Sequence, residues 1–258
     1  EKASELSRAY GDRSSALSPD EIERVARKAR RIYLNWSPGV IEQNAGFFDK
    51  IDYVIDEYDE LGMPHLPPHL HDEPDFYDYQ LLKQADVVLL QHMFRDDFTG
   101  QQRRESYDFY EKRTTHKSSL SPSMYCLMGI DVGSAERARK YFLLSSSMDL
   151  ADRQRTTAKG LHLACMGGSW QAAVFGFGGF RTHEADGEPH VTIDPWLPEE
   201  YVSLEYTVAV HGRRLRVHVG HDVASVELAP DSRGPVRVVV CGDEAVLEPG
   251  DVHSAPRR

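Results

Sequence analysis

The feature that most constrains the fold of this chain is a change in the spacing of its apolar residues near His183. Before that point, apolar residues recur at helical intervals, as at Ile22, Val25 and Ala29. After it, short runs such as 203–210 alternate apolar and polar residues, as strands do. Helices followed by strands, without regular alternation of the two, indicate separate helical and β units rather than an α/β sheet. We therefore expect a mainly α chain with a small all-β module, an antiparallel sheet, at its carboxyl end.

The same patterns set the expected boundaries. A helical part over residues 1–185 and a β-sheet domain over 186–258 are predicted, with Asp194–Pro198 as the hinge between them. Ser18 and Glu21 form a capping box, so a helix should begin at Pro19. The stretch 36–74 is expected to be a long structured loop. Further helices are expected at 79–94, 101–112, 121–132, 135–150 and 169–177.

Charge and cysteine content exclude several classes of function. The formal net charge of −11 argues against a nucleic-acid partner, because phosphate backbones favour basic surfaces. No apolar stretch is long enough to cross a membrane. The cysteines Cys126, Cys165 and Cys241 are far apart and form no CxxC pair, so we expect buried free thiols in a reducing compartment, and hence a cytoplasmic protein.

The most informative polar stretch is 113–123, which packs His116, Lys117 and several hydroxyls ahead of an apolar helical segment. Clustered hydroxyls, positive charge and the free N–H groups of a helix start suit a small oxyanion such as phosphate. A serine helix cap would need only one of these hydroxyls, and from spacing alone the cap interpretation is the safer one.

Other candidate residues are weaker when taken alone. Lys83 and Gln84 side by side can bind sugar hydroxyls, although a solvated first helical turn explains them equally well. His65, His69 and His71 cluster without a carboxylate at ligand spacing, so we expect no metal site. The glycines of 160–168 match neither the dinucleotide fingerprint nor the P-loop pattern.

Four blocks in order resemble glycoside hydrolase family 65. They are Lys83-Gln84-Ala85-Asp86-Val87, the run from Phe109 to Ser123, the block from Gly160 to Gln171 and Gly176-Phe177-Gly178-Gly179-Phe180-Arg181. The resemblance runs in register from about Gln43 to the β module. That family contains inverting α-glucoside phosphorylases, which act on maltose, kojibiose, nigerose or trehalose, and some α-glucoside hydrolases.

The resemblance carries implications for fold and site. It implies that this chain corresponds to the second half of an (α/α)6 toroid followed by the family's small carboxy-terminal sheet domain. Lys83 and Gln84 would contact the glucose on the non-reducing side of the scissile bond, and His116, Ser118 and Ser119 would line the phosphate pocket. No cofactor is implied; inorganic phosphate would be a co-substrate beside an α-linked disaccharide. Family members are commonly homodimers.

One expected catalytic group is missing from the sequence. The family's general acid is a glutamate in a Gly-Pro-Asp-Glu-Tyr block, which would lie upstream of Glu1, and no such block occurs in this chain. Inverting cleavage needs that acid and a nucleophile on the opposite face of the sugar. In a phosphorylase the nucleophile is phosphate, whereas a hydrolase needs a carboxylate base, for which Glu111 is the nearest candidate. Glu111 is also explained as a helix-end residue paired with Arg113 or Lys112.

Three hypotheses follow. The first is the carboxy-terminal part of an α-glucoside phosphorylase that releases β-glucose 1-phosphate. The second is a hydrolase of the same family, and the third is a truncated, non-catalytic fragment. We expect that the chain alone does not cleave a glycosidic bond, because the general acid is absent.

Overall fold

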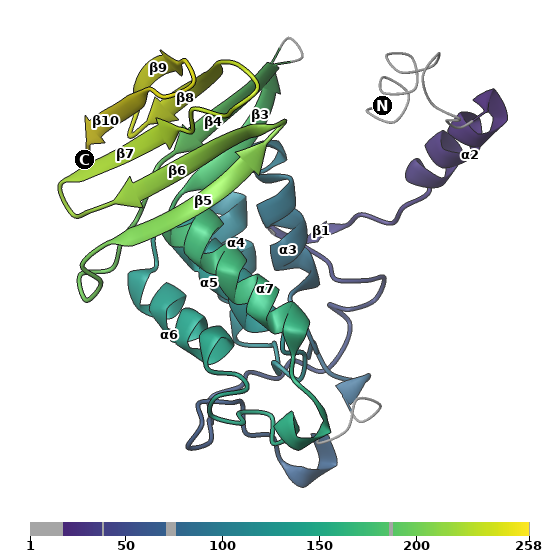
Figure 1. The fold of residues 1–258 in the computed structure, drawn as a ribbon. Helices are drawn as coiled ribbons and strands as arrows, with labels where there is room; N and C mark the ends of the chain where they lie inside the picture. Colours follow the sequence, from purple (N-terminus) through teal and green to yellow (C-terminus); the bar gives the residue numbers. More distant parts are fainter. Residues whose placement is uncertain (1–17, 38, 71–75, 186–187, 258) are drawn as a thin grey trace.

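The structure is a computed structural model that describes residues 18–37, 39–70, 76–185 and 188–257. Within these residues the helices precede an extended run of strands, as the spacing of apolar residues predicts (Figure 1). The described helices are α2 Pro19–Ala29, α3 Asp86–Met93, α4 Gly100–Glu111, α5 Ser121–Asp131, α6 Ala135–Ser146 and α7 Leu163–Gln171. The last of these continues into a π-helical segment, η5, at Ala172–Phe177. No helix in this part of the chain has the length and apolar character needed to span a bilayer.

Helix α5 is the centre of the helical part. Tyr125, Cys126 and Met128 on it are fully buried, and helices α3, α4, α6 and α7 all pack against it. Gly129 allows this central position, because its lack of a side chain lets α6 approach α5 closely. A Cβ at Gly129 would lie 3.1 Å from the backbone of Ala138.

Helix α2 forms as its capping box predicts. Ser18 accepts the N–H of Glu21, and the Glu21 carboxylate accepts the N–H of Ser18 at 2.7 Å. No residue of α2 is buried, however, and the helix stands apart from the other helices (Figure 1). Its apolar face, which includes Val25, therefore packs on nothing among the described residues.

The stretch after α2 is a long structured loop, as expected. In its described residues, 36–37 and 39–70, it contains the two-residue strands β1 Trp36–Ser37 and β2 Val40–Ile41 and a short 3-10 turn at Pro68–Leu70. Leu66 and Leu70 pack with Ile55 in a small core under this loop. Of the clustered histidines, His71 lies outside the described residues.

The β module contains two sheets rather than the one that was expected. In the described residues, the first has the order β3-β4-β8-β9 and the second the order β10-β7-β6-β5, and their buried valines form one core. The strands are β3 Phe180–Ala185, β4 Glu188–Ile193, β5 Leu204–Val210, β6 Arg213–Val219, β7 Val223–Leu228, β8 Val236–Val240, β9 Asp243–Leu247 and β10 Val252–Pro256. Pairing is antiparallel except for β4 with β8, which run parallel. Strands β5, β6 and β7 lie between β4 and β8 in the chain and belong to the other sheet. The pairing of β4 with β8 therefore cannot be predicted from neighbouring residues in the sequence.

The predicted hinge at Asp194–Pro198 was wrong. This segment connects β4 to β5 inside the β module, and strand β3 already begins at Phe180. The junction lies at Gly178 and Gly179, directly after η5. Gly179 has φ +62°, and a Cβ there would lie 2.0 Å from the carbonyl oxygen of Asp194, so only glycine fits without a shift of the backbone. Asp194 contacts this junction, because its N–H donates to the Gly179 carbonyl at 3.1 Å, but it does not connect the helices to the strands.

Candidate active-site region

The predicted sugar and phosphate segments lie side by side. The Leu82 N–H donates to the Arg113 carbonyl at 2.8 Å, and the Thr115 N–H donates to the Leu82 carbonyl at 2.7 Å. Leu82 and Ala85 are buried, whereas Lys83 and Gln84 between them are exposed. This short parallel bridge therefore presents Lys83 and Gln84 next to the segment that leads into His116.

The His116 imidazole points into the core. Its side chain is 1% exposed and packs between the rings of Tyr125 and Tyr141, with centroids 5.2 and 5.1 Å away. Nδ1 lies 2.8 Å from Oγ of Ser121, whose hydroxyl donates to the Ser118 carbonyl. A hydroxyl has one proton to give, so Ser121 must accept from His116, and Nδ1 carries the ring proton.

This arrangement keeps His116 neutral. Nε2 is buried and has no hydrogen-bond partner among the described residues. Burial, with a smaller contribution from the Lys140 ammonium, lowers the pKa of His116 from 6.5 to about 3. His116 also has φ +52°, a left-handed conformation that turns the loop sharply before α5. The ring thus supports the loop from beneath, and its role as a phosphate ligand stays a prediction.

The loop residues after His116 form the accessible surface of this region. Lys117, Ser118 and Ser119 are half-buried, between the enclosed His116 and the start of α5. The N-cap residue of α5 is Leu120, which makes no side-chain cap bond. Ser121 and Ser123 instead donate to the carbonyls of Ser118 and Leu120. The simple serine cap is therefore wrong, because the hydroxyls just inside α5 are directed at carbonyls rather than at helix N–H groups.

Glu111 is part of a buried polar pair. Its carboxylate accepts the Tyr141 hydroxyl at 2.7 Å and lies 3.9 Å from Nζ of Lys140. The expected pairing with Arg113 was wrong, because Arg113 binds Asp52 at 2.7 Å across the loop after α2. Glu111 is 8% exposed, so it has little access to solvent water.

A second histidine, which sequence reasoning did not single out, lies in the loop between α6 and α7. His162 Nδ1 is 2.6 Å from Oδ1 of Asp149, and the His162 backbone N–H donates to the other carboxylate oxygen at 2.8 Å. The His162 side chain is 21% exposed. The bond to the imidazole is the main reason that the pKa of Asp149 lies below its ordinary value. His162 belongs to the Gly160 block, but nothing in the sequence marks Asp149 as its partner.

This loop is attached to the His116 segment. Gln154 Nε2 donates to the His116 carbonyl at 3.0 Å. Helix α7, which the loop leads into, crosses α5 closely, since a Cβ at Gly168 would lie 2.4 Å from Oγ of Ser123. In Figure 1 the loop lies at the end of the helices that faces away from the β module.

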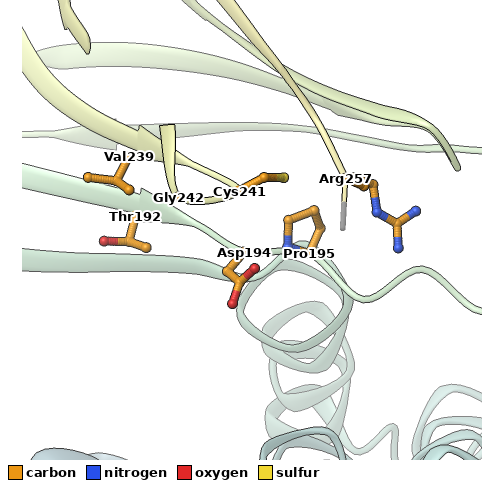
Figure 2. Close-up of a pocket in the computed structure, with 7 residues that line it drawn as sticks. All are labelled: Thr192, Asp194, Pro195, Val239, Cys241, Gly242 and Arg257. Atoms are coloured by element: carbon orange, nitrogen blue, oxygen red, sulfur yellow. The ribbon is translucent and has the colours of Figure 1, made fainter. Parts of the chain in front are cut away.

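Two cavities among the described residues lie away from the predicted site residues. A cleft of about 1700 Å³ opens between α3, α5 and the strands, where Asp131 binds Arg181 at 2.9 Å and ties α5 to β3. A smaller pocket of about 340 Å³ in the β module is lined by Asp194, Cys241 and Arg257, among others (Figure 2). The described residues hold no group of side chains arranged as a metal site, and Cys126, Cys165 and Cys241 are buried and form no disulfide.

Comparisons with known proteins match most of the chain. Residues 1–171 match the model of the glycosyl hydrolase family 65 central catalytic domain, and residues 186–247 match that of the glycosyl hydrolase family 65 C-terminal domain. A kojibiose phosphorylase of Caldanaerobacter subterraneus subsp. tengcongensis is 42% identical over 234 residues, which cover 90% of this chain and 30% of that protein. An alpha,alpha-trehalose phosphorylase of Thermoanaerobacter brockii is 34% identical, over 92% of this chain and 30% of that protein.

One solved structure supports the fold. A putative kojibiose phosphorylase from the human microbiome superimposes with a TM-score of 0.75 at 23% identity, over 93% of this chain and 31% of that one. At this identity the likeness concerns the fold alone. The chain spans about 30% of the length of the curated relatives described above.

Proposed function

Because the chain belongs to glycosyl hydrolase family 65, we propose that it forms part of an inverting α-glucoside phosphorylase. The enzyme would cleave an α-linked disaccharide such as kojibiose, trehalose or maltose with inorganic phosphate and release β-glucose 1-phosphate. The half-toroid arrangement of the helices is part of this proposal. A cytoplasmic location and a homodimeric assembly stay predictions.

The observation that carries the proposal is the backbone bridge between Leu82 and the segment before His116. It brings an exposed lysine and amide, suited to sugar hydroxyls, next to a loop rich in hydroxyls and cations. In the proposal Lys83 and Gln84 bind the glucose unit. Ser118 and Ser119 bind phosphate, and His116 fixes the turn that presents them.

The chemistry needs no carboxylate base in this region. Phosphate attacks the anomeric carbon from the face opposite the leaving oxygen, and a general acid protonates that oxygen. The chain offers hydroxyls, N–H groups and Lys117 to hold the nucleophile, which is what an anionic attacking group requires. The general acid would come from sequence that this chain does not contain, so we expect no cleavage by the 258 residues alone.

The alternative is an inverting hydrolase of the same family, with Glu111 as the base that activates water. The geometry does not favour it, because Glu111 is 8% exposed and its carboxylate already accepts the Tyr141 hydroxyl. A base must reach the attacking water by a hydrogen bond.

The decisive experiment incubates the full-length enzyme containing this chain with each disaccharide, with and without phosphate. Phosphate-dependent cleavage with β-glucose 1-phosphate as the first product is expected. Equal turnover without phosphate would establish the hydrolase instead. In that case Glu111→Gln should abolish activity, whereas a phosphorylase should retain most of its turnover in this variant.

A further inference from the structure

Among the described residues, Asp149 and His162 form a partly exposed carboxylate–imidazole pair at the end of the helices where the predicted site lies. Asp149 accepts two hydrogen bonds from the same residue, one from the ring and one from the backbone N–H. The two contacts fix both the position and the rotation of the ring. A carboxylate accepts only, so Nδ1 carries a proton and Nε2 is left to face other groups.

The surroundings of Nε2 leave it available. Its one described contact is Oγ1 of Thr156 at 3.4 Å, which is at the limit of hydrogen bonding. The side chain is partly exposed, in contrast to His116, whose two ring nitrogens are both enclosed. Of these two histidines, His162 is therefore the one whose ring can reach a ligand.

The position of His162 connects it with the predicted pocket. The loop that ends at His162 bonds to the His116 carbonyl through Gln154. Helix α7 begins directly after His162 and crosses α5 at Gly168 and Ser123, about 9 Å further along its axis. The Gln154 contact therefore keeps the loop before α7 next to the segment that leads into α5.

The charge of this region favours an anion. The exposed Lys159 lies in the same loop as His162, where Arg155 is paired with Glu60 at 2.8 Å, and Lys117 follows His116, whose carbonyl this loop contacts. The carboxylates of this loop already accept hydrogen bonds within the loop. Asp149 accepts from His162, and Asp152 accepts the Thr157 N–H at 2.9 Å. With Nδ1–H donating to the carboxylate, Nε2 is the ring atom that can accept the hydroxyl of hydrogen phosphate.

We propose that His162 is a further phosphate-binding residue of this site and that Asp149 is its positioning residue. Nε2 of His162 accepts the hydroxyl of hydrogen phosphate, while Asp149 holds the ring in place. This inference rests on the proposed phosphorylase function, because the phosphate in question is the co-substrate of that reaction. It adds the loop before α7 to the residues that bind this phosphate.

The test titrates the full chain with inorganic phosphate and follows the His162 ring nitrogens and the Ser118 and Ser119 amides by NMR. The wild-type protein should show Nδ1 protonated before phosphate is added, and phosphate should shift the Nε2 resonance and the loop amides together. Asp149→Asn keeps the shape of the side chain and removes the charge, and it should weaken phosphate binding about tenfold or more. His162→Gln should weaken it to a similar extent.

Asp152→Asn is the matched control, because Asp152 stabilises the same loop without touching His162. It should leave phosphate affinity within about twofold of the wild type, and Asp149→Glu, which restores the carboxylate, should recover part of the loss. Equal affinity in Asp149→Asn and wild type would overturn the inference. So would an unmoved His162 ring, or equal losses in Asp149→Asn and Asp152→Asn.

These outcomes are distinguishable from a failure of the proposed function. Phosphate-independent cleavage by the full-length enzyme would reject the phosphorylase, whatever the titration shows. Phosphate-dependent cleavage together with an unmoved His162 ring would reject only the role of Asp149 and His162.

Discussion

At the scale of residues, the candidate active-site region contains a buried histidine, His116, and a partly exposed one, His162. His116 is enclosed by Tyr125 and Tyr141 and held neutral through Ser121, whereas His162 is half-buried and tied to Asp149. The sequence pointed to His116 and contained His162 only as one residue of the Gly160 block, because burial depends on which rings fold around each imidazole. The first supports a loop, and the second is available to a ligand.

The enclosed histidine gives a prediction about pH. The folded-state pKa of His116, about 3, lies below its ordinary value of 6.5, so below pH 6.5 the unfolded chain binds a proton that the folded chain does not. The folded protein therefore keeps its full free energy of unfolding above pH 6.5, where His116 is neutral in both states, and loses part of it as the pH falls toward 3. Between pH 8 and pH 5 we expect this group to cost about 2 kcal/mol of unfolding free energy.

The measurement is urea unfolding at a series of pH values for the wild type and His116→Asn, since asparagine tolerates the left-handed backbone. The variant should be less stable at pH 8 but should lose less stability on acidification. Parallel pH profiles for the two proteins would show that His116 is not the sensitive group. The exposed His218 provides the control, and His218→Asn should leave the profile unchanged.

At the scale of elements, local signals placed most helices correctly. The capping box at Ser18 and the apolar spacing of α4, α5 and α6 predicted elements that the structure contains. The sequence could not show how they meet. The parallel pairing of β4 with β8 and the junction at Gly179 depend on contacts between residues far apart in the chain, and the hinge was misplaced for that reason.

The crossing of α5 and α7 gives a prediction from two adjacent glycines on α7. A Cβ at Gly168 would meet Ser123, which is fully buried, whereas a Cβ at Gly167 would meet nothing within 4 Å. Gly168→Ala should therefore destabilise the protein by about 1–3 kcal/mol. Gly167→Ala should stabilise it by up to about 1 kcal/mol, because alanine favours the helix more than glycine does.

Chemical unfolding of the two variants beside the wild type provides the check. Gly168→Ala should lower the free energy of unfolding and Gly167→Ala should raise it, and the two changes need not be equal in size. If both variants stabilise the protein, the helices do not cross at Ser123 as closely as described here.

At the scale of the whole molecule, the chain has two cores and a poorly covered surface. One core lies around α5 and the other lies between the two sheets. Apolar side chains nevertheless remain exposed on the helical side, with Leu150 90% and Leu163 72% exposed, and α2 has no buried residue. Exposed apolar surface of this kind promotes association.

We therefore expect the isolated chain to self-associate. Sedimentation equilibrium over a range of protein concentrations should give an apparent mass that rises with concentration, above the 29.2 kDa of the monomer. Leu163→Glu, which places a charge on this exposed face, should reduce the association. A monodisperse monomer that melts cooperatively at all concentrations would contradict this expectation.

In the proposed reaction, phosphate, and not water, is the nucleophile at the site formed around α5 and α7. The reverse reaction tests it most directly, because a phosphorylase joins sugars from a sugar phosphate whereas a hydrolase does not. The full-length enzyme supplied with β-glucose 1-phosphate and glucose should release inorganic phosphate and form an α-linked disaccharide, and it should not use the α-anomer. If β-glucose 1-phosphate with glucose yields neither phosphate nor disaccharide, in an enzyme that cleaves the disaccharide in water, the claim is wrong.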